Sequence, residues 1–193
     1  MKKVLILSIA FLFASTIGFA QATNISSGTT VKYVANAGGG ASVDFNVKIA
    51  AMDNDGIDLE YTVKQGAKSF NGKIFVTKKG WEKGSKLNWD DLAPNKEKQL
   101  NDDETSFMFS SDFYNALVKN NSAKYDNTTY TVKKIPAGQN IMLNGKPVDV
   151  IYVVSGATGA QYWVLKNPKL PLIMKITGNK TGPDFSLAGI SKS

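Results

Sequence analysis

The sequence predicts a mainly β protein: a curved antiparallel sheet that forms an open or half β-barrel, with one short helix. Apolar and polar residues alternate with a period of two over several segments, as in strands with one buried and one exposed face. Turn signals rich in Asn, Asp and Gly separate these segments. Only one segment has the period of an amphipathic helix, so parallel βαβ units do not fit.

The first predicted hairpin joins residues 42–49 to residues 57–64, both of which alternate strictly. Between them lies the run Asp53-Asn54-Asp55-Gly56, a strong turn, so we expect these two strands to pair antiparallel. A third strand over residues 69–77 follows the turn at Gly66 and continues the meander.

The middle of the chain is different. Residues 80–109 show no clean strand period, and we expect a long crossover. A helix is expected to begin at Ser111-Asp112, because these residue types favour helix N-termini. Asn120-Asn121 should end it, and its apolar face would consist of Phe113, Tyr114, Leu117 and Val118.

Strands resume at residues 128–135. Asn144-Gly145, between residues 141–143 and residues 148–155, is the strongest hairpin signal, because Asn-Gly supplies the two positive φ angles of a type I′ turn. Residues 148–154 are nearly all apolar, which predicts a central strand covered on both faces. Three more antiparallel strands are expected at residues 161–165, 172–177 and 185–190.

The first residues have the pattern of a secretory signal peptide: Lys2 and Lys3 precede an apolar stretch, and small residues follow. Cleavage is expected after Ala20. An uncleaved anchor is the alternative, but the apolar stretch is shorter than the roughly 20 residues of a spanning helix. We expect a signal peptide (1–20), a polar lead-in (21–30) and a single β domain (31–193). The mature protein would be periplasmic or extracellular, with no membrane span.

The composition excludes much chemistry. Cysteine and histidine are absent, and every basic residue is a lysine. Disulfides, Ser-His-Asp triads and typical zinc sites are therefore excluded, as is bidentate recognition of anions by arginine. We expect no cofactor and no metal, and a protein that is not an enzyme. The net charge is +7, but the lysines are scattered rather than clustered with aromatic residues, so no nucleic-acid partner is expected.

Four aromatic residues are candidates for ligand binding. Trp81 and Trp89 lie in the crossover and could line a pocket, where aromatic faces bind apolar chains or sugar rings. Phe113 and Tyr114 of the predicted helix complete the set. The alternative is that the two tryptophans fill the core under the loop. Trp163 lies within a strand and is expected in the core.

Two acidic runs are candidates for functional sites. The run from Asp53 to Asp58 invites a calcium interpretation, but its spacing differs from the helix-flanked calcium loop, and we interpret it as a hairpin turn. Residues 101–104 (Asn-Asp-Asp-Glu), with Asp90 and Asp91, are the only plausible carboxylate pair for glycoside hydrolysis. That reaction needs one carboxyl kept protonated by burial, whereas these should be solvated. No catalytic residue is predicted.

Residues 162–176 (YWVLKNPKLPLIMKI) and 182–187 (GPDFSL) carry a family resemblance. They resemble the ending of secreted bacterial domains related to the periplasmic lipoprotein carriers, and residues 17–21 (IGFAQ) are similar to signal peptides of Bacteroidetes-type bacteria. The resemblance implies an open, strongly curved antiparallel sheet around a helix, with a concave apolar face that holds acyl chains. The chain lacks the carriers' functional arginine and has fewer helices than their lid.

Three functions follow as hypotheses. The first is a non-catalytic binding module for an apolar or amphiphilic ligand, such as a lipid or lipoprotein, held in a half-barrel cavity. The second is a structural or interaction module of the cell envelope that recognises polysaccharide or another protein. The third is a carboxylate-dependent glycan hydrolase that uses Asp102, Asp103 and Glu104.

Overall fold

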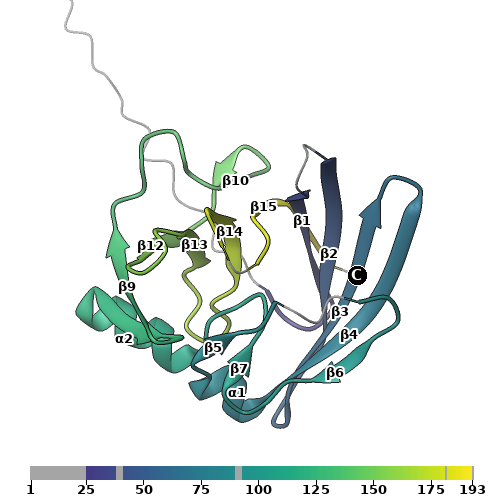
Figure 1. Cartoon of the computed structure of the whole chain (residues 1–193), viewed down its shortest axis with the longest axis horizontal. Coiled ribbons are helices and arrows are strands. Elements are labelled where there is room, and N and C mark those ends of the chain that lie inside the picture. The colour runs from purple at the N-terminus through teal and green to yellow at the C-terminus, as the bar shows by residue number, and fades with distance from the viewer. Residues whose placement is uncertain (1–24, 38–40, 90–92, 181, 193) are drawn as a thin grey trace, which may run out of the picture.

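The computed structural model describes residues 25–37, 41–89, 93–180 and 182–192. The predicted signal peptide, residues 21–24 of the lead-in, and Asp90 and Asp91 lie outside these ranges. Figure 1 shows a strongly curved sheet, with the helices on the side that the sheet leaves open.

Within the described ranges, the large sheet has eleven strands and confirms the predicted mainly β fold. Its order is β6 (Glu97–Gln99), β4 (Lys68–Thr77), β3 (Gly56–Gln65), β2 (Ala41–Met52), β1 (Thr29–Ala37), β15 (Phe185–Lys192), β14 (Ile173–Thr177), β13 (Gln161–Leu165), β12 (Val150–Ser155), β9 (Thr128–Lys133) and β8 (Ser122–Tyr125). The two end strands, β6 and β8, do not pair with each other, so the sheet stays open. β1 and β8 were not predicted as strands; β1 begins inside the expected lead-in.

The meander β2–β3–β4 forms as predicted, with pairing along almost its whole length. The β2–β3 turn is the expected hairpin turn. An Asp53 carboxylate oxygen accepts the Asp55 N–H at 2.9 Å, and Gly56 has a φ of 154°. A Cβ at Gly56 would lie 2.2 Å from the Val76 carbonyl oxygen, so this position requires glycine. Within the described ranges, no three acidic residues gather as a metal-binding group.

The sequence predicted one helix, and the described residues form two. The expected helix is α2 (Ser111–Asn120), whose N-cap is Ser110, one residue before the predicted start, and whose C-cap Asn121 is left-handed. The additional helix, α1 (Lys78–Lys83), has only six residues, too few to show a 3.6-residue period. Its Gly80 N–H donates to the Thr77 hydroxyl at 3.0 Å. Gly80 lets α1 lie close to the backbone of Glu104, because a Cβ at this position would be 2.6 Å from the Glu104 carbonyl oxygen.

The predicted crossover contains short parallel strands, contrary to the expectation of antiparallel pairing alone. β6 pairs with β4 in parallel, and β5 (Lys86–Leu87) pairs with β7 (Glu104–Thr105) in parallel. The β4–β6 connection passes through α1, and parallel neighbours require such a crossover. These strands have two or three residues, which is too short for an alternating pattern to be recognised.

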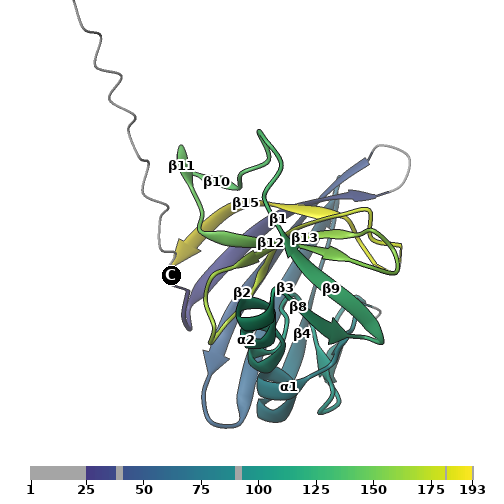
Figure 2. The same cartoon turned by 90° about the vertical axis from the view of Figure 1, so that its left-hand side faces the viewer.

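The Asn144-Gly145 turn has the predicted positive φ angles, 51° and 75°. Its arms, β10 (Met142–Leu143) and β11 (Lys146–Pro147), form a separate two-stranded ribbon. The ribbon continues as far as the Val148 N–H, which donates to the Ile141 carbonyl oxygen at 2.8 Å. The strand expected to complete this hairpin, β12, pairs with β9 and β13 instead. β12 is covered on both faces, as predicted: Val150 and Tyr152 are buried on one face, and Val153 and Ser155 on the other. Figure 2 shows the ribbon and α2 on opposite sides of this part of the sheet.

The side of the sheet that faces the helices is filled by the end of the crossover. Residues 105–110 are all buried, and Phe107, Met108 and Phe109 have no exposed surface. They belong to one hydrophobic cluster with side chains of the large sheet. Neither described helix has the length and apolar character needed to span a membrane.

Candidate functional site

The four predicted ligand-binding residues do not form one site. Trp89 is half-buried and contacts Phe107 and Phe185 edge to face, each with a centroid distance of 5.9 Å. Phe113 and Tyr114 are buried on the inner side of α2. Trp81 lies on α1 and lines an open pocket. Trp163 is fully buried, as predicted, and Lys175 Nζ lies 4.4 Å from its ring centroid.

Phe113 belongs to an aromatic cluster with Phe109, Tyr125, Tyr130 and Tyr162. Its ring centroid lies 4.6 Å from that of Tyr125. Burial raises the pKa of the Tyr125 hydroxyl well above its usual range, and that hydroxyl lies 2.7 Å from the Thr105 hydroxyl. Phe113 also contributes to a groove between α2 and β8. These contacts indicate mainly a role in packing.

Two buried tyrosines provide a matched prediction. The Tyr33 hydroxyl is buried, and no described residue forms a hydrogen bond with it, whereas Tyr125 is paired with Thr105. Tyr33→Phe is expected to leave the free energy of unfolding unchanged or raise it by about 1 kcal/mol, because it removes an unsatisfied group. Tyr125→Phe should lower it by about 1–3 kcal/mol, because Thr105 loses a partner. Urea unfolding of both variants measures the difference; a large loss in Tyr33→Phe would contradict it.

In the Trp81 pocket, four segments of the described chain converge. The pocket has a volume of about 420 Å³. Side chains come from the β2–β3 turn, α1, α2 and the turn between β13 and β14. The lining residues are Asp53, Asn54, Lys78, Trp81, Glu82, Ser111, Asn115, Pro168 and Lys169.

Hydrogen bonds hold the walls of the Trp81 pocket in place. The Trp81 indole N–H donates to the Lys169 carbonyl oxygen and so joins α1 to the β13–β14 turn. The side-chain oxygen of Asn167 accepts the N–H of Lys169 at 3.1 Å. On the other side, the Lys78 N–H donates to the Asp55 carbonyl oxygen at 2.8 Å. The pocket is therefore formed before a ligand arrives, which reduces the entropy lost on binding.

The chemistry of the Trp81 pocket is polar and balanced. Two lysines and two acidic residues give it no net charge, and it offers amide and hydroxyl groups beside one indole ring. Within the described part of the chain, Asn54, Glu82 and Asn115 make no side-chain hydrogen bond. Such a site can donate hydrogen bonds to, and accept hydrogen bonds from, a neutral ligand that carries many hydroxyl groups.

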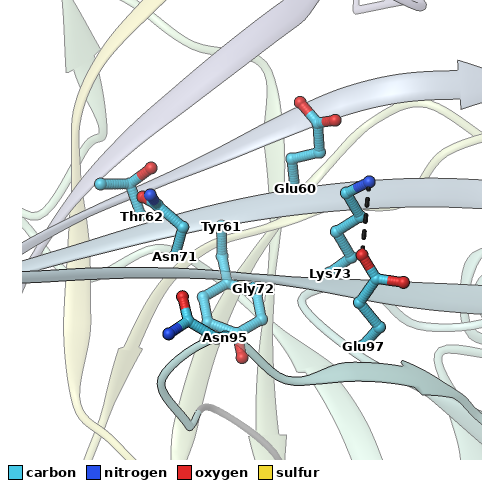
Figure 3. Close-up of a pocket in the computed structure, with 8 residues that line it drawn as sticks. All are labelled: Glu60, Tyr61, Thr62, Asn71, Gly72, Lys73, Asn95 and Glu97. Carbon is cyan, nitrogen blue, oxygen red and sulfur yellow. Dashed lines mark ion pairs between the residues drawn. The ribbon is translucent and has the colours of Figure 1, made fainter.

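A second pocket, which we call the edge pocket, lies where β3, β4 and the β6 segment meet (Figure 3). Its volume is about 460 Å³, and it is lined by Glu60, Tyr61, Thr62, Asn71, Gly72, Lys73, Asn95 and Glu97. Glu97 pairs with Lys73 at 3.5 Å, and Glu60 pairs with Lys48 at 3.1 Å. The Tyr61 ring passes over its cross-strand partner Gly72 and donates its hydroxyl proton to the Ala93 carbonyl oxygen at 2.8 Å.

The acidic run at residues 101–104 is engaged in local contacts. Asp102 accepts from the Thr77 hydroxyl at 2.9 Å and pairs with Lys79 at 3.3 Å; both contacts lower its pKa. Asp103 pairs with Lys86 at 2.7 Å, which lowers the pKa of Asp103 and raises that of Lys86. Because lowered pKa values favour the ionised form, neither carboxyl suits the general acid of a hydrolase.

Comparison with known proteins identifies no family. No protein-family model, curated protein or solved structure matches the chain. The curved, open and mostly antiparallel sheet that the resemblance implied is present, whereas the relationship to the lipoprotein carriers is not shown.

Sequence reasoning identified Trp81 but missed the rest of its pocket. Asp53-Asn54 was interpreted as a turn, and residues 168–169 as part of the strand connection. No sequence signal brings these segments to one place, because their contact depends on how the sheet curves around α1 and α2.

Proposed function

We propose that this protein is an exported, non-catalytic binding module that recognises a neutral glycan of the cell envelope or its surroundings through the Trp81 pocket. The observation that supports this best is an indole ring that lines an open, pre-formed pocket together with amides, hydroxyls and carboxylates from four segments. This corresponds to the predicted interaction module for polysaccharide.

A sugar suits these groups for two physical reasons. One face of a pyranose ring is apolar and can stack on an indole, which has a large rigid apolar surface. The ring hydroxyls both donate and accept hydrogen bonds, and Asn54, Glu82 and Asn115 offer both kinds of partner. The balance of lysines and acids in the pocket favours a neutral sugar over a uronic acid or an amine, since a charged ligand would find no net opposite charge.

The geometry gives less support to an apolar ligand inside the curved sheet, because buried side chains of residues 105–110 already occupy that side. A hydrolase is also less well supported, because Asp102 and Asp103 are ion-paired at the surface with lowered pKa values.

The Trp81→Ala variant tests the proposal. The screen uses native gels that each contain one neutral polysaccharide, such as a β-glucan, a xylan or a mannan. We expect one of these gels to retard the wild-type protein. Trp81→Ala should bind that polysaccharide about ten-fold or more weakly, equivalent to about 1.4 kcal/mol. Titration calorimetry with the matching hexasaccharide gives the Kd.

Two further variants make the result interpretable. Lys83→Ala lies on the same helix but outside the pocket, and its affinity should match the wild type. Asn115→Ala changes an exposed pocket residue without touching the Trp81–Lys169 hydrogen bond and should also weaken binding. The proposal fails if no neutral glycan binds, or if both pocket variants bind like the wild type.

A further inference from the structure

The outer edge of β4 is only partly covered. β6 pairs with Lys73–Phe75, while β4 itself starts at Lys68. Three hydrogen bonds show which backbone groups face this edge: the Lys73 N–H donates to Lys96 O at 2.8 Å, the Asn95 N–H to Asn71 O at 2.7 Å, and the Leu100 N–H to Phe75 O at 2.9 Å. The odd-numbered residues of β4 therefore direct their N–H and C=O groups away from β3.

The same alternation applies to Ser69. It lies opposite Lys64 in the regular β3–β4 pairing, two residues before Asn71, so both its N–H and its C=O point to the outer edge. No described strand covers the edge at Ser69, and the Asn71 N–H points the same way. An uncovered edge of this kind is a template for the backbone of one more strand.

The edge pocket lies directly beside this uncovered stretch, and Asn71 belongs to both. Alternate side chains of an added strand would point to the same face of the sheet, two residues apart. One of them would reach the edge pocket, whose amides, Thr62 hydroxyl and internally paired charges suit a small polar side chain such as Ser, Thr or Asn.

The charge around the uncovered stretch indicates the nature of the partner. Lys64 and Lys68 are exposed there, and neither forms an ion pair with any acid in the described ranges. A second copy of this chain would bring lysines against lysines, and like charges on neighbouring strands are destabilising. An acidic segment would be attracted, so the lysines both prevent self-pairing and favour an acidic partner.

We propose that the open half of β4 binds an extended, acidic segment of another polypeptide by strand addition. The bound strand would place an acidic residue near Lys64 and, two residues further along, a small polar residue in the edge pocket. This surface shares no lining residue with the Trp81 pocket, so it can act whether or not the protein binds a glycan.

The test uses a synthetic peptide that repeats Glu-Ser-Thr-Ser (the Thr-Glu peptide), which puts Glu and Thr two residues apart on one face. The matched peptide repeats Lys-Ser-Thr-Ser (the Thr-Lys peptide). We expect the Thr-Glu peptide to bind at least about ten-fold more tightly than the Thr-Lys peptide, because its charge is opposite to that of Lys64 and Lys68. Amide resonances of Ser69 and Asn71 should shift on binding. Ser69→Pro should abolish binding, because it removes an outward N–H while edge strands tolerate proline. Ser69→Ala keeps the N–H and should bind normally.

A double charge reversal, Lys64→Glu with Lys68→Glu, should invert the preference towards the Thr-Lys peptide. Circular dichroism verifies that each variant is folded. The proposal is overturned if neither peptide binds the wild type, if Ser69→Pro binds as well as Ser69→Ala, or if the charge reversal leaves the preference unchanged; in the last case the edge does not select an acidic partner.

Discussion

Phe109→Ala is expected to lower the free energy of unfolding by about 3–5 kcal/mol, the usual cost of truncating a buried phenylalanine. Phe109 has no exposed surface, and its ring contacts Phe113, Tyr125, Tyr130 and Tyr162. Its N–H also donates to Pro171 O at 3.2 Å. The side chain therefore joins α2 to three strands of the sheet, and its loss would leave a cavity that rigid rings cannot collapse to fill.

Urea unfolding followed by circular dichroism measures this effect. Val118→Ala, on the neighbouring α2 and 53% exposed, is the control and should change stability by less than about 0.5 kcal/mol. Phe109→Leu should lower the free energy of unfolding less than Phe109→Ala does, because it leaves a smaller cavity. A loss below about 1 kcal/mol in Phe109→Ala would contradict the packing described for this cluster.

Gly72→Ala is expected to lower the free energy of unfolding by about 1–3 kcal/mol, the cost of overpacking. A Cβ at this position would lie 2.1 Å from the Tyr61 hydroxyl oxygen and 2.7 Å from Lys96 O. Tyr61 cannot move aside easily, because its hydroxyl donates to Ala93 O and also accepts the Ala93 N–H at 3.2 Å. Gly189→Ala is the control: its nearest neighbour would be 3.8 Å away, so stability should hold or rise slightly.

A double-mutant cycle isolates the contact between Tyr61 and Gly72. In a Tyr61→Ala background, Gly72→Ala should cost less by about 1 kcal/mol or more, because the contact with the ring is gone and only that with Lys96 O remains. Strictly additive free energies would show that the ring does not restrict this position.

The sequence predicted three long strands because their side chains alternate between a buried and an exposed face over eight or more residues. β2, β3 and β4 all follow this rule. β1, with its nine residues, was not predicted. β8 and β6 were missed because they have four and three residues, and α1 was missed because a single turn and a half has no measurable period. The Asn144-Gly145 turn formed as predicted, but this local signal did not show that β12 pairs with β9 and β13 rather than with the ribbon.

The candidate site was predicted only in part. Trp81 lines a pocket, whereas Trp89 packs against Phe107 and Phe185, as the alternative interpretation of the tryptophans allowed, and Phe113 and Tyr114 are buried on α2. An aromatic residue in a polar segment is equally compatible with a pocket wall and with a core. What decides between them is the curvature of the sheet, which brings residues 53–54 and 168–169 beside α1; local sequence patterns do not encode that contact.

The central position of the β1–β15 pair has a consequence for how the molecule folds. The first and last described strands lie side by side in the middle of the sheet, so the two meanders on either side are joined by residues from opposite ends of the described chain. Each meander can form from local pairings, but the loop that closes between them spans nearly the whole domain, which makes this closure slow. Until it occurs, β1 and β15 would both present bare interior edges, and the half-assembled chain should be most prone to aggregate at that stage.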